Sequence, residues 1–243
     1  MKRIICALFV LISSSVYAGY NVPYPVVTSG LNTLHFALQS IFKSTYNGPI
    51  STQQEHFIGY VQYGFLNILD IGITANYHIV DIKTPINKER QLGIGDSTLY
   101  GRLYIFGNKW IDLGLKCDLN VPLGNENFTA HTFTHNSILI SEFNLIYFRP
   151  YITFGHYTIN KTNGYFRFNF GIQKMIVPAW IPFVDIYTEV SQKGDDEQIP
   201  CWVVLGSIIK IKEHALRIEY IINTKEFSSE KGFFALRYMY NFK

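Results

Sequence analysis

The sequence of 243 residues is poor in charge and lacks long apolar runs. Only 16% of the residues are Asp, Glu, Lys or Arg, whereas soluble domains carry roughly 25%, so few ionic groups can cover an ordinary water-exposed surface. No uncharged apolar stretch reaches the roughly 18 residues of a membrane-spanning helix, and the mean hydropathy is only +0.08. The net charge is +3 without a basic block, which predicts no nucleic-acid partner.

Cysteine is also scarce, with three residues in the chain. Cys6 lies in MKRIICALFVLISSSVYA, where a positive start, a short apolar core and a small-residue site before Gly19 predict a signal peptide over 1–18. A membrane anchor is the alternative, but the apolar core is too short to span a bilayer. Cys117 and Cys201 then remain and could form a disulfide. They fall on distant predicted strands, so we expect two free thiols.

Motifs for catalysis or cofactors are missing. The chain has no phosphate loop, dinucleotide fingerprint, Cys-x-x-Cys pair or G-x-S-x-G elbow, so we predict neither a cofactor, nor a resident metal, nor an enzyme. The nearest approach to a hydrolase is GHYTIN (155–160), which offers Thr158 on the same face as His156. An outer-membrane lipid hydrolase therefore stays a lesser alternative.

What the chain has in abundance is alternation of apolar and polar residues. In IDLGLKCDLNVPLG (111–124) every odd position from Ile111 to Val121 is apolar, and the even positions are charged, amide or glycine. LDIGITANYHIV (69–80) and FFALRYMYNF (233–242) behave in the same way. This period of two predicts strands with one apolar and one polar face. Such strands occur in soluble sandwiches and lipocalin-type barrels as well as in membrane barrels.

The connections favour the membrane barrel. They alternate between short turns and longer polar loops, an arrangement that outer-membrane barrels show and soluble β folds have no reason to adopt. The short set is 66–68, 107–109, 149–150, 175–180 and 212–214, and the long set is 44–52, 82–95, 122–136, 192–199 and 224–231, with 161–164 as a brief member. The twelve predicted strands are 31–43, 53–65, 69–81, 96–106, 110–121, 137–148, 151–160, 165–174, 181–191, 200–211, 215–223 and 232–242.

We therefore predict an all-β fold, a transmembrane antiparallel up-and-down β-barrel of about twelve strands of the outer-membrane type. Residues 19–30 form a periplasmic lead-in, and residues 31–243 form one barrel domain. The expected location is the outer membrane of a Gram-negative bacterium, with membrane lipid and the barrel-assembly machinery as partners. Aromatic residues near strand ends would form the interfacial girdles: Trp110, Tyr147, Phe148, Trp180, Trp202, Tyr238 and Phe242.

Charged and amide side chains on the polar faces are candidates for the lumen wall. They are Arg102, Asp112, Lys116, Asp118, Asn120, Glu142, Arg167, Asp185, Glu189, Arg217, Glu219 and Arg237. Two interpretations stay open: a network of paired charges that stiffens the barrel, or a pathway that contacts a passing solute. A turn centred on Asn108 would place Arg102 diagonal to Asp112 and Lys116.

Histidines offer weaker candidates. A turn centred on Asn67 makes His56 and His78 direct cross-strand partners on the lumen face near the outer rim, where they could bind a metal or act as a pH-dependent gate. His131 and His135 are four residues apart in a predicted loop, and a metal site there is also conceivable.

Three segments carry a family resemblance. YVQYGFLNILDIGITANY (60–77), IGDSTLYGRLYIF (94–106) and the 111–124 stretch resemble a family of outer-membrane barrels named for the meta-pathway of phenol degradation. The family's Gly-Asp before a strand is Gly95-Asp96 here, and its Pro-Thr-Gly after a strand is Pro122-Leu123-Gly124, with Leu for Thr. The resemblance implies a signal-bearing porin or transporter without catalytic residues to carry over.

The functional expectation is passive permeation or uptake of a small, hydrophobic or aromatic solute. The alternative is a structural or adhesive barrel that acts through its outer loops, 82–95 and 122–136. The sequence does not specify the solute, an open or plugged lumen, or the oligomeric state.

Overall fold

The computed structural model describes residues 31–47, 49–145, 148–158, 164–177, 179–191, 201–224 and 232–242. The predicted signal peptide and lead-in lie outside this part of the chain. Among the described residues all regular structure is β, and no helix is long and apolar enough to cross a membrane. The strands are β1 (Leu34–Asn47), β2 (Ile50–Leu66), β3 (Leu69–Lys83), β4 (Lys88–Ile94), β5 (Ser97–Gly107), β6 (Ile111–Val121), β7 (Thr134–Phe143), β8 (Arg149–Thr158), β9 (Gly164–Gln173), β10 (Trp180–Ser191), β11 (Cys201–Ile211), β12 (His214–Asn223) and β13 (Gly232–Phe242).

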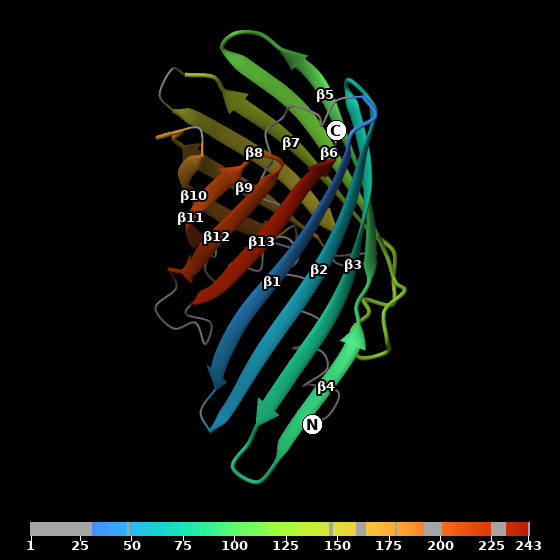
Figure 1. Cartoon of the computed structure of the whole chain (residues 1–243). Helices are drawn as coiled ribbons and strands as arrows, with labels where there is room; N and C mark the ends of the chain where they lie inside the picture. The colour runs from blue at the N-terminus through green and yellow to red at the C-terminus, as the bar shows by residue number, and fades with distance from the viewer. Residues whose placement is uncertain are drawn as a thin grey trace.

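The strands close into one antiparallel barrel (Figure 1). Each strand pairs with its neighbour in sequence, and β1 pairs with both β2 and β13, which closes the wall. β4 and β5 occupy one position in the wall because both pair with β3. β5 pairs with the first half of β3 and β4 with the second half. The wall therefore has twelve positions, which confirms the predicted transmembrane-type barrel fold.

Two predicted loops are extended hairpins instead. Residues 44–52 continue β1 and β2 up to the pair Asn47 and Ile50, and 82–95 contains β4, whose hairpin with β3 ends in a turn that Thr84 and Asn87 close. Backbone hydrogen bonds make these polar segments part of the strands, although their side-chain pattern does not predict strands. β7 also lies earlier than predicted, at 134–143 instead of 137–148.

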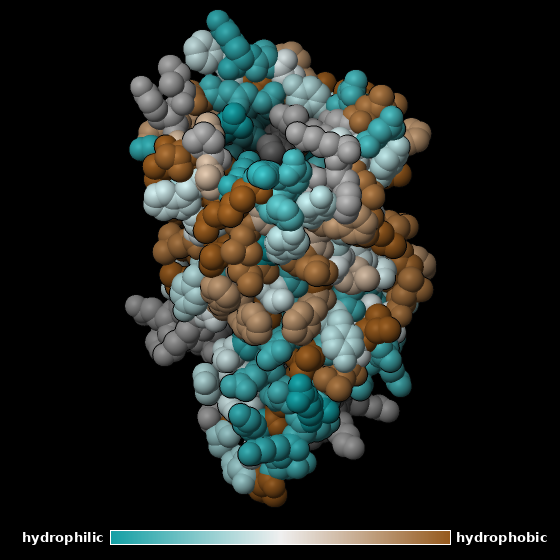
Figure 2. Space-filling view, viewed as in Figure 1, coloured by the Kyte–Doolittle hydropathy of each residue, from teal (hydrophilic) through white to brown (hydrophobic). Residues whose placement is uncertain are grey.

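The two ends of the barrel differ in the way that the connections predict. The short β2–β3, β5–β6 and β11–β12 turns lie at the end where β1 begins and β13 ends, and the β1–β2 and β3–β4 hairpins project from the opposite end (Figure 1). Figure 2 shows apolar side chains across the middle of the visible face of the wall and a mostly hydrophilic surface on the projecting hairpins. This distribution matches a membrane belt with polar rims.

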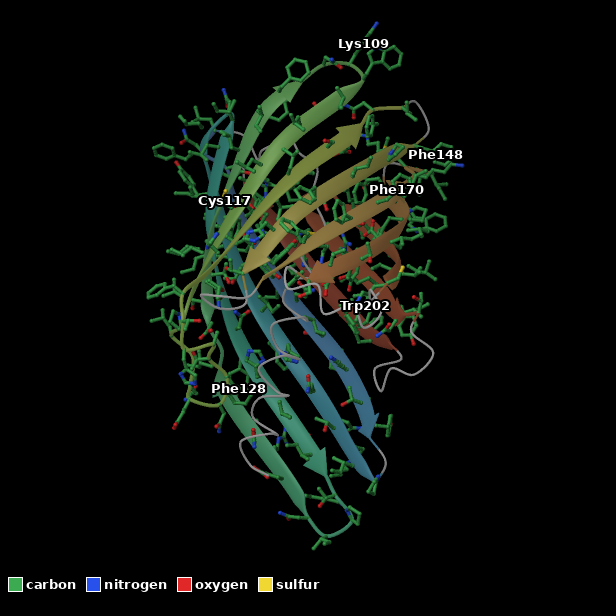
Figure 3. All side chains as sticks on the ribbon, turned by 180° about the vertical axis from the view of Figure 1, so that it is seen from behind. Lys109, Cys117, Phe128, Phe148, Phe170 and Trp202 are labelled. Carbon is green, nitrogen blue, oxygen red and sulfur yellow. The ribbon has the colours of Figure 1, made fainter. Side chains whose placement is uncertain are left out.

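The wall has an apolar outer face and a polar inner face. Outward side chains such as Leu38 and Phe170 are 67% and 51% exposed, whereas the inward Asp70 and Asp185 are 0% exposed. Phe148 and Phe170 project outward in Figure 3. Charges are costly in hydrocarbon but stable against polar neighbours, so this polarity is that of a membrane barrel and opposite to that of a soluble one.

The structure tests two expectations about single side chains, the free cysteines and the position of Trp202. Cys117 and Cys201 are free, as predicted, and Cys117 is exposed on the outer face. Trp202 does not join an outer girdle: its ring lies inside the barrel, 5.9 Å from that of Phe233. The prediction for Trp202 was wrong because proximity to a strand end does not say which face a residue occupies.

Candidate functional site: the inner wall

All twelve predicted lumen residues lie on the inner face of the wall, and they make polar contacts with one another or with neighbouring inward residues. On β5, Arg102 binds the carboxylate of Asp70 on β3, with Nη2 2.6 Å from Oδ2. On β6, Lys116 Nζ lies 2.7 Å from Asp118 Oδ1. On the far side, Arg217 Nε donates to Glu219 Oε2 at 2.7 Å.

The remaining candidates are held in the same manner. Arg167 pairs with Glu189, and Tyr151 donates to Asp185. Tyr104 and Asn144 donate to Asp112, Gln173 donates to Glu142, and Asn120 bonds to Thr98 and Asp96. Arg237 Nε donates to Gln39 Oε1 at 2.9 Å. Five of the twelve are cationic and six anionic, so their charges nearly cancel.

The predicted position of Arg102 is corrected by the register. Arg102 lies directly opposite Lys116 rather than diagonal to it, and Tyr100 lies opposite Asp118. The turn is centred between Lys109 and Trp110 rather than on Asn108, since Gly107 lies opposite Asp112, and a bulge between Tyr104 and Phe106 then shifts the pairing by one residue. On its other side Arg102 lies directly opposite Asp70 of β3, whose carboxylate it binds.

One side of the inner wall is apolar, a feature that the sequence analysis missed. Ile41, Phe183, Tyr187, Val204 and Phe233 form a buried cluster inside the barrel with Ile58, Ile221 and Ala235. The Tyr187 and Trp202 rings stack at 6.0 Å. The alternation of faces along each strand could have predicted that these residues point inward. Each lies an even number of residues from a predicted lumen-facing residue of its own strand, or opposite such a residue on the next strand.

Aromatic rings cover part of this wall around one cation. The guanidinium carbon of Arg167 lies 4.9 Å from the centroid of the Tyr157 ring, 5.7 Å from that of Tyr165 and 4.7 Å from that of Tyr187. Such contacts stabilise a cation away from bulk water. Glu189 and the three rings thus surround the Arg167 guanidinium.

The structure brings His56 and His78 together. They are cross-strand partners, with 2.5 Å between their Nδ1 atoms, and both are buried. The pair lies at the level of Ala235, close to the first residues of β13. Among the described residues no three His, Cys, Asp or Glu side chains are grouped as a metal site would need, so a metal or gating role for the pair stays a prediction.

A loop over the pair is anchored by Asp96, in the break between β4 and β5. The Asp96 carboxylate accepts hydrogen bonds from the backbone N–H groups of Gly124 (3.1 Å) and Ala130 (2.8 Å). Phe128 of the same loop stacks on His78, with 5.2 Å between ring centroids. Residues 122–133 are thus fastened to the inner face of β3, and Gly95-Asp96 has an architectural role.

On the outer face, neighbouring strands juxtapose polar residues far apart in sequence. Ser137 on β7 lies opposite His156 on β8, a pairing that linear spacing conceals. The His135 and His156 rings lie 6.0 Å apart. Thr158, the residue considered as a partner for His156, instead exchanges hydrogen bonds with the backbone of His135. His131 lies in the 122–133 loop with φ of 57°.

Comparisons with known proteins agree on the architecture. No protein-family model matches the chain, and no curated protein matches it in sequence. An outer membrane channel from Pseudomonas putida F1 matches in structure with a TM-score of 0.68 at 11% identity, over 90% of this chain and 99% of that one. The KdgM porin matches with 0.59 at 8%, over 86% and 99%.

LpxR from Salmonella typhimurium has a TM-score of 0.54 at 7% identity, over 86% of this chain and 99% of its own. Identities this low establish the shared fold and nothing finer. The chain is a closed antiparallel β-barrel of the kind found in outer-membrane channels and porins.

Proposed function

We propose that the protein is a passive outer-membrane channel for small neutral solutes. The observation that carries this proposal is the inner wall: charged side chains line a closed barrel whose outer face is apolar. A membrane barrel with twelve wall positions is wider than the eight-stranded kind that side chains alone can fill. A polar interior of that width supports a water-accessible route.

The chemistry of the wall supports an uncharged solute with an apolar face. Several inward charges are paired, as in Arg102–Asp70 and Arg217–Glu219, and the twelve candidates carry five positive and six negative groups, so neither sign dominates. The Ile41, Phe183 and Phe233 side adds buried apolar side chains to the same inner wall. Hydrophobic or aromatic small molecules fit both features. The resemblance to the meta-pathway family supports the same class of solute, and we propose that the chain is a barrel of that type.

The direct test is conductance in planar lipid bilayers. Purified, folded protein should give discrete current steps, with a reversal potential near zero in a salt gradient because the paired charges favour neither ion. Liposomes containing the protein should swell in isosmotic neutral sugars, and empty liposomes should not. A barrel that shows the heat-dependent gel shift of a folded outer-membrane protein yet stays silent in both assays would refute the channel.

We also propose that residues 1–18 direct export and that the barrel-assembly machinery inserts the mature chain. The wall itself acts without catalysis in this proposal. Pure protein should therefore leave phospholipid and lipid A intact. Turnover that His156→Ala abolished would instead identify a lipid hydrolase.

A further inference from the structure

The turn between β9 and β10 exposes apolar side chains at the end of the outer wall. Met175, Ile176 and Val177 are all exposed, and so is Trp180 at the start of β10. Backbone hydrogen bonds fix this turn: the Ile176 N–H donates to the Trp180 carbonyl at 3.1 Å, and the Trp180 N–H donates to the Val177 carbonyl at 2.9 Å. Three adjacent exposed apolar side chains in a turn indicate an interaction surface rather than ordinary solvent contact.

Lysine residues lie on both sides of this turn. Lys174 begins the turn, and its Nζ is 5.1 Å from the centroid of the Phe148 ring in the β7–β8 connection. On the other side, the backbone N–H of Lys210 in β11 donates to the Ala179 carbonyl at 2.7 Å. Lys212 follows in the β11–β12 turn, and all three lysines are exposed. The apolar turn is therefore flanked by ammonium groups.

The positive charge at this end of the barrel is not balanced by carboxylates. Among the described residues, the exposed charged side chains of this end are cationic except for Glu213. The salt bridges in the described part of the chain do not include Lys174, Lys210 or Lys212. Arg149 differs from them, because it lies 3.7 Å from a carboxylate of β7. The exposed cationic residues of this end are Lys109, Arg149, Lys174, Lys210 and Lys212.

We propose that a rim patch, formed by residues 175–177, Trp180, Lys174, Lys210 and Lys212, binds an anionic glycerophospholipid. Its phosphate contacts the ammonium groups, and its acyl chains pack against the 175–177 side chains and Trp180. Basic and apolar side chains together favour an anionic lipid surface. An acidic protein would complement only the lysines, whereas the apolar residues continue the lipid-covered outer wall through the exposed β11 residue opposite Trp180. Tight turns face the periplasm, so the lipid belongs to the inner leaflet. The patch is separate from the lumen and independent of permeation.

The first test removes charge from the patch. The rim variant Lys174→Gln with Lys210→Gln is compared with wild type and with a hairpin variant, Lys83→Gln with Lys88→Gln, which loses two exposed lysines of the opposite end. Dioleoylphosphatidylglycerol and dioleoylphosphatidylcholine are titrated separately in mild detergent, and bound lipid is counted by native mass spectrometry. A basic residue near an anionic surface changes binding about fivefold. Wild type and the hairpin variant should therefore prefer phosphatidylglycerol at least tenfold, and the rim variant should lose at least fivefold of this preference. The heat-dependent gel shift must show that all three proteins are folded.

The second test places an anion in the turn. Ile176→Asp should weaken phosphatidylglycerol binding at least tenfold, because it repels the phosphate and removes an apolar contact. Ile86→Asp, at the exposed tip of the β3–β4 hairpin, should leave binding unchanged. An unchanged preference in the rim variant would overturn the proposal, as expected if the lysines instead face an acidic periplasmic protein. Equal binding of both lipids by the wild type would also overturn it, and so would lipid A bound in place of phosphatidylglycerol. Conductance is measured separately, so a silent barrel with this lipid preference would refute only the channel.

Discussion

At the scale of single residues, Asp70 shows how the wall keeps a charge inside the barrel. Its carboxylate is completely buried and accepts hydrogen bonds from Arg102 Nε at 3.2 Å, Arg102 Nη2 at 2.6 Å and Gln62 Nε2 at 3.0 Å. Burial of a lone carboxylate is unfavourable, and burial of a well-bonded ion pair is close to neutral. The Arg102–Asp70 pair therefore fixes the positions of the two side chains and adds little net stability.

Arg102→Met should lower the free energy of unfolding by about 3–5 kcal/mol, because it leaves the Asp70 carboxylate buried without its cation. The double variant Asp70→Asn with Arg102→Met should recover most of that loss, since no unpaired charge remains. Guanidinium unfolding of the detergent-solubilised barrel, followed by the gel shift, measures both. A loss below about 1 kcal/mol in the single variant would mean that lumen water already solvates the carboxylate.

At the scale of elements, the break between β4 and β5 controls the loop that follows β6. Asp96 sits in that break, and its carboxylate binds backbone N–H groups at both ends of the 124–130 segment. Bonds from N–H groups to a charged carboxylate are among the stronger hydrogen bonds. The loop is consequently held against β3, and Phe128 covers His78.

Removal of the Asp96 carboxylate should release this loop. In Asp96→Ala, a glutamyl endopeptidase should cleave after the exposed Glu126 at least fivefold faster than in the wild type, as mass mapping of the fragments would show. Asp81→Asn is the control, because its ion pair with Arg90 lies on the exposed hairpin at 3.7 Å. Unchanged cleavage in Asp96→Ala would show that the Phe128–His78 contact and the hydrogen bonds between Asn125 and Ile94 retain the loop without the carboxylate.

At the scale of the whole molecule, the barrel is polarised along its axis. The tip of the β3–β4 hairpin carries Ile86, which is 97% exposed, and the opposite end carries the β5–β6 turn with Lys109 (Figures 1 and 3). Tight turns face the periplasm in bacterial outer-membrane barrels. The hairpins should therefore project from the cell surface.

Cysteine labelling tests this orientation. In a background with Cys117 and Cys201 replaced by Ser, Ile86→Cys should react with a membrane-impermeant maleimide on intact cells. Lys109→Cys should react only after the outer membrane is permeabilised. The reverse pattern would place the hairpins in the periplasm and contradict the assignment of the two ends.

Much of this architecture follows from the sequence alone. Alternation along 111–121 and 69–80 determines which residues share a face, because successive side chains of a strand point to opposite sides. The low charge content and the alternation of short and long connections then indicate a membrane barrel, in which the apolar faces point outward. The inward positions of Arg102, Asp118 and Glu219 and the pairing of His56 with His78 follow from those local rules and a count from one tight turn.

Only the tertiary structure decided what depends on register and closure. The β3–β5 register placed Arg102 opposite Asp70, and backbone pairing converted the 82–95 loop into β4. Closure of the wall gathered Ile41, Phe183 and Phe233 into one inner cluster. The juxtaposition of Ser137 and His156 is of the same kind. Periodicity is a property of one strand, whereas a bulge shifts the alternation of faces and the register with the neighbouring strand decides which residues meet.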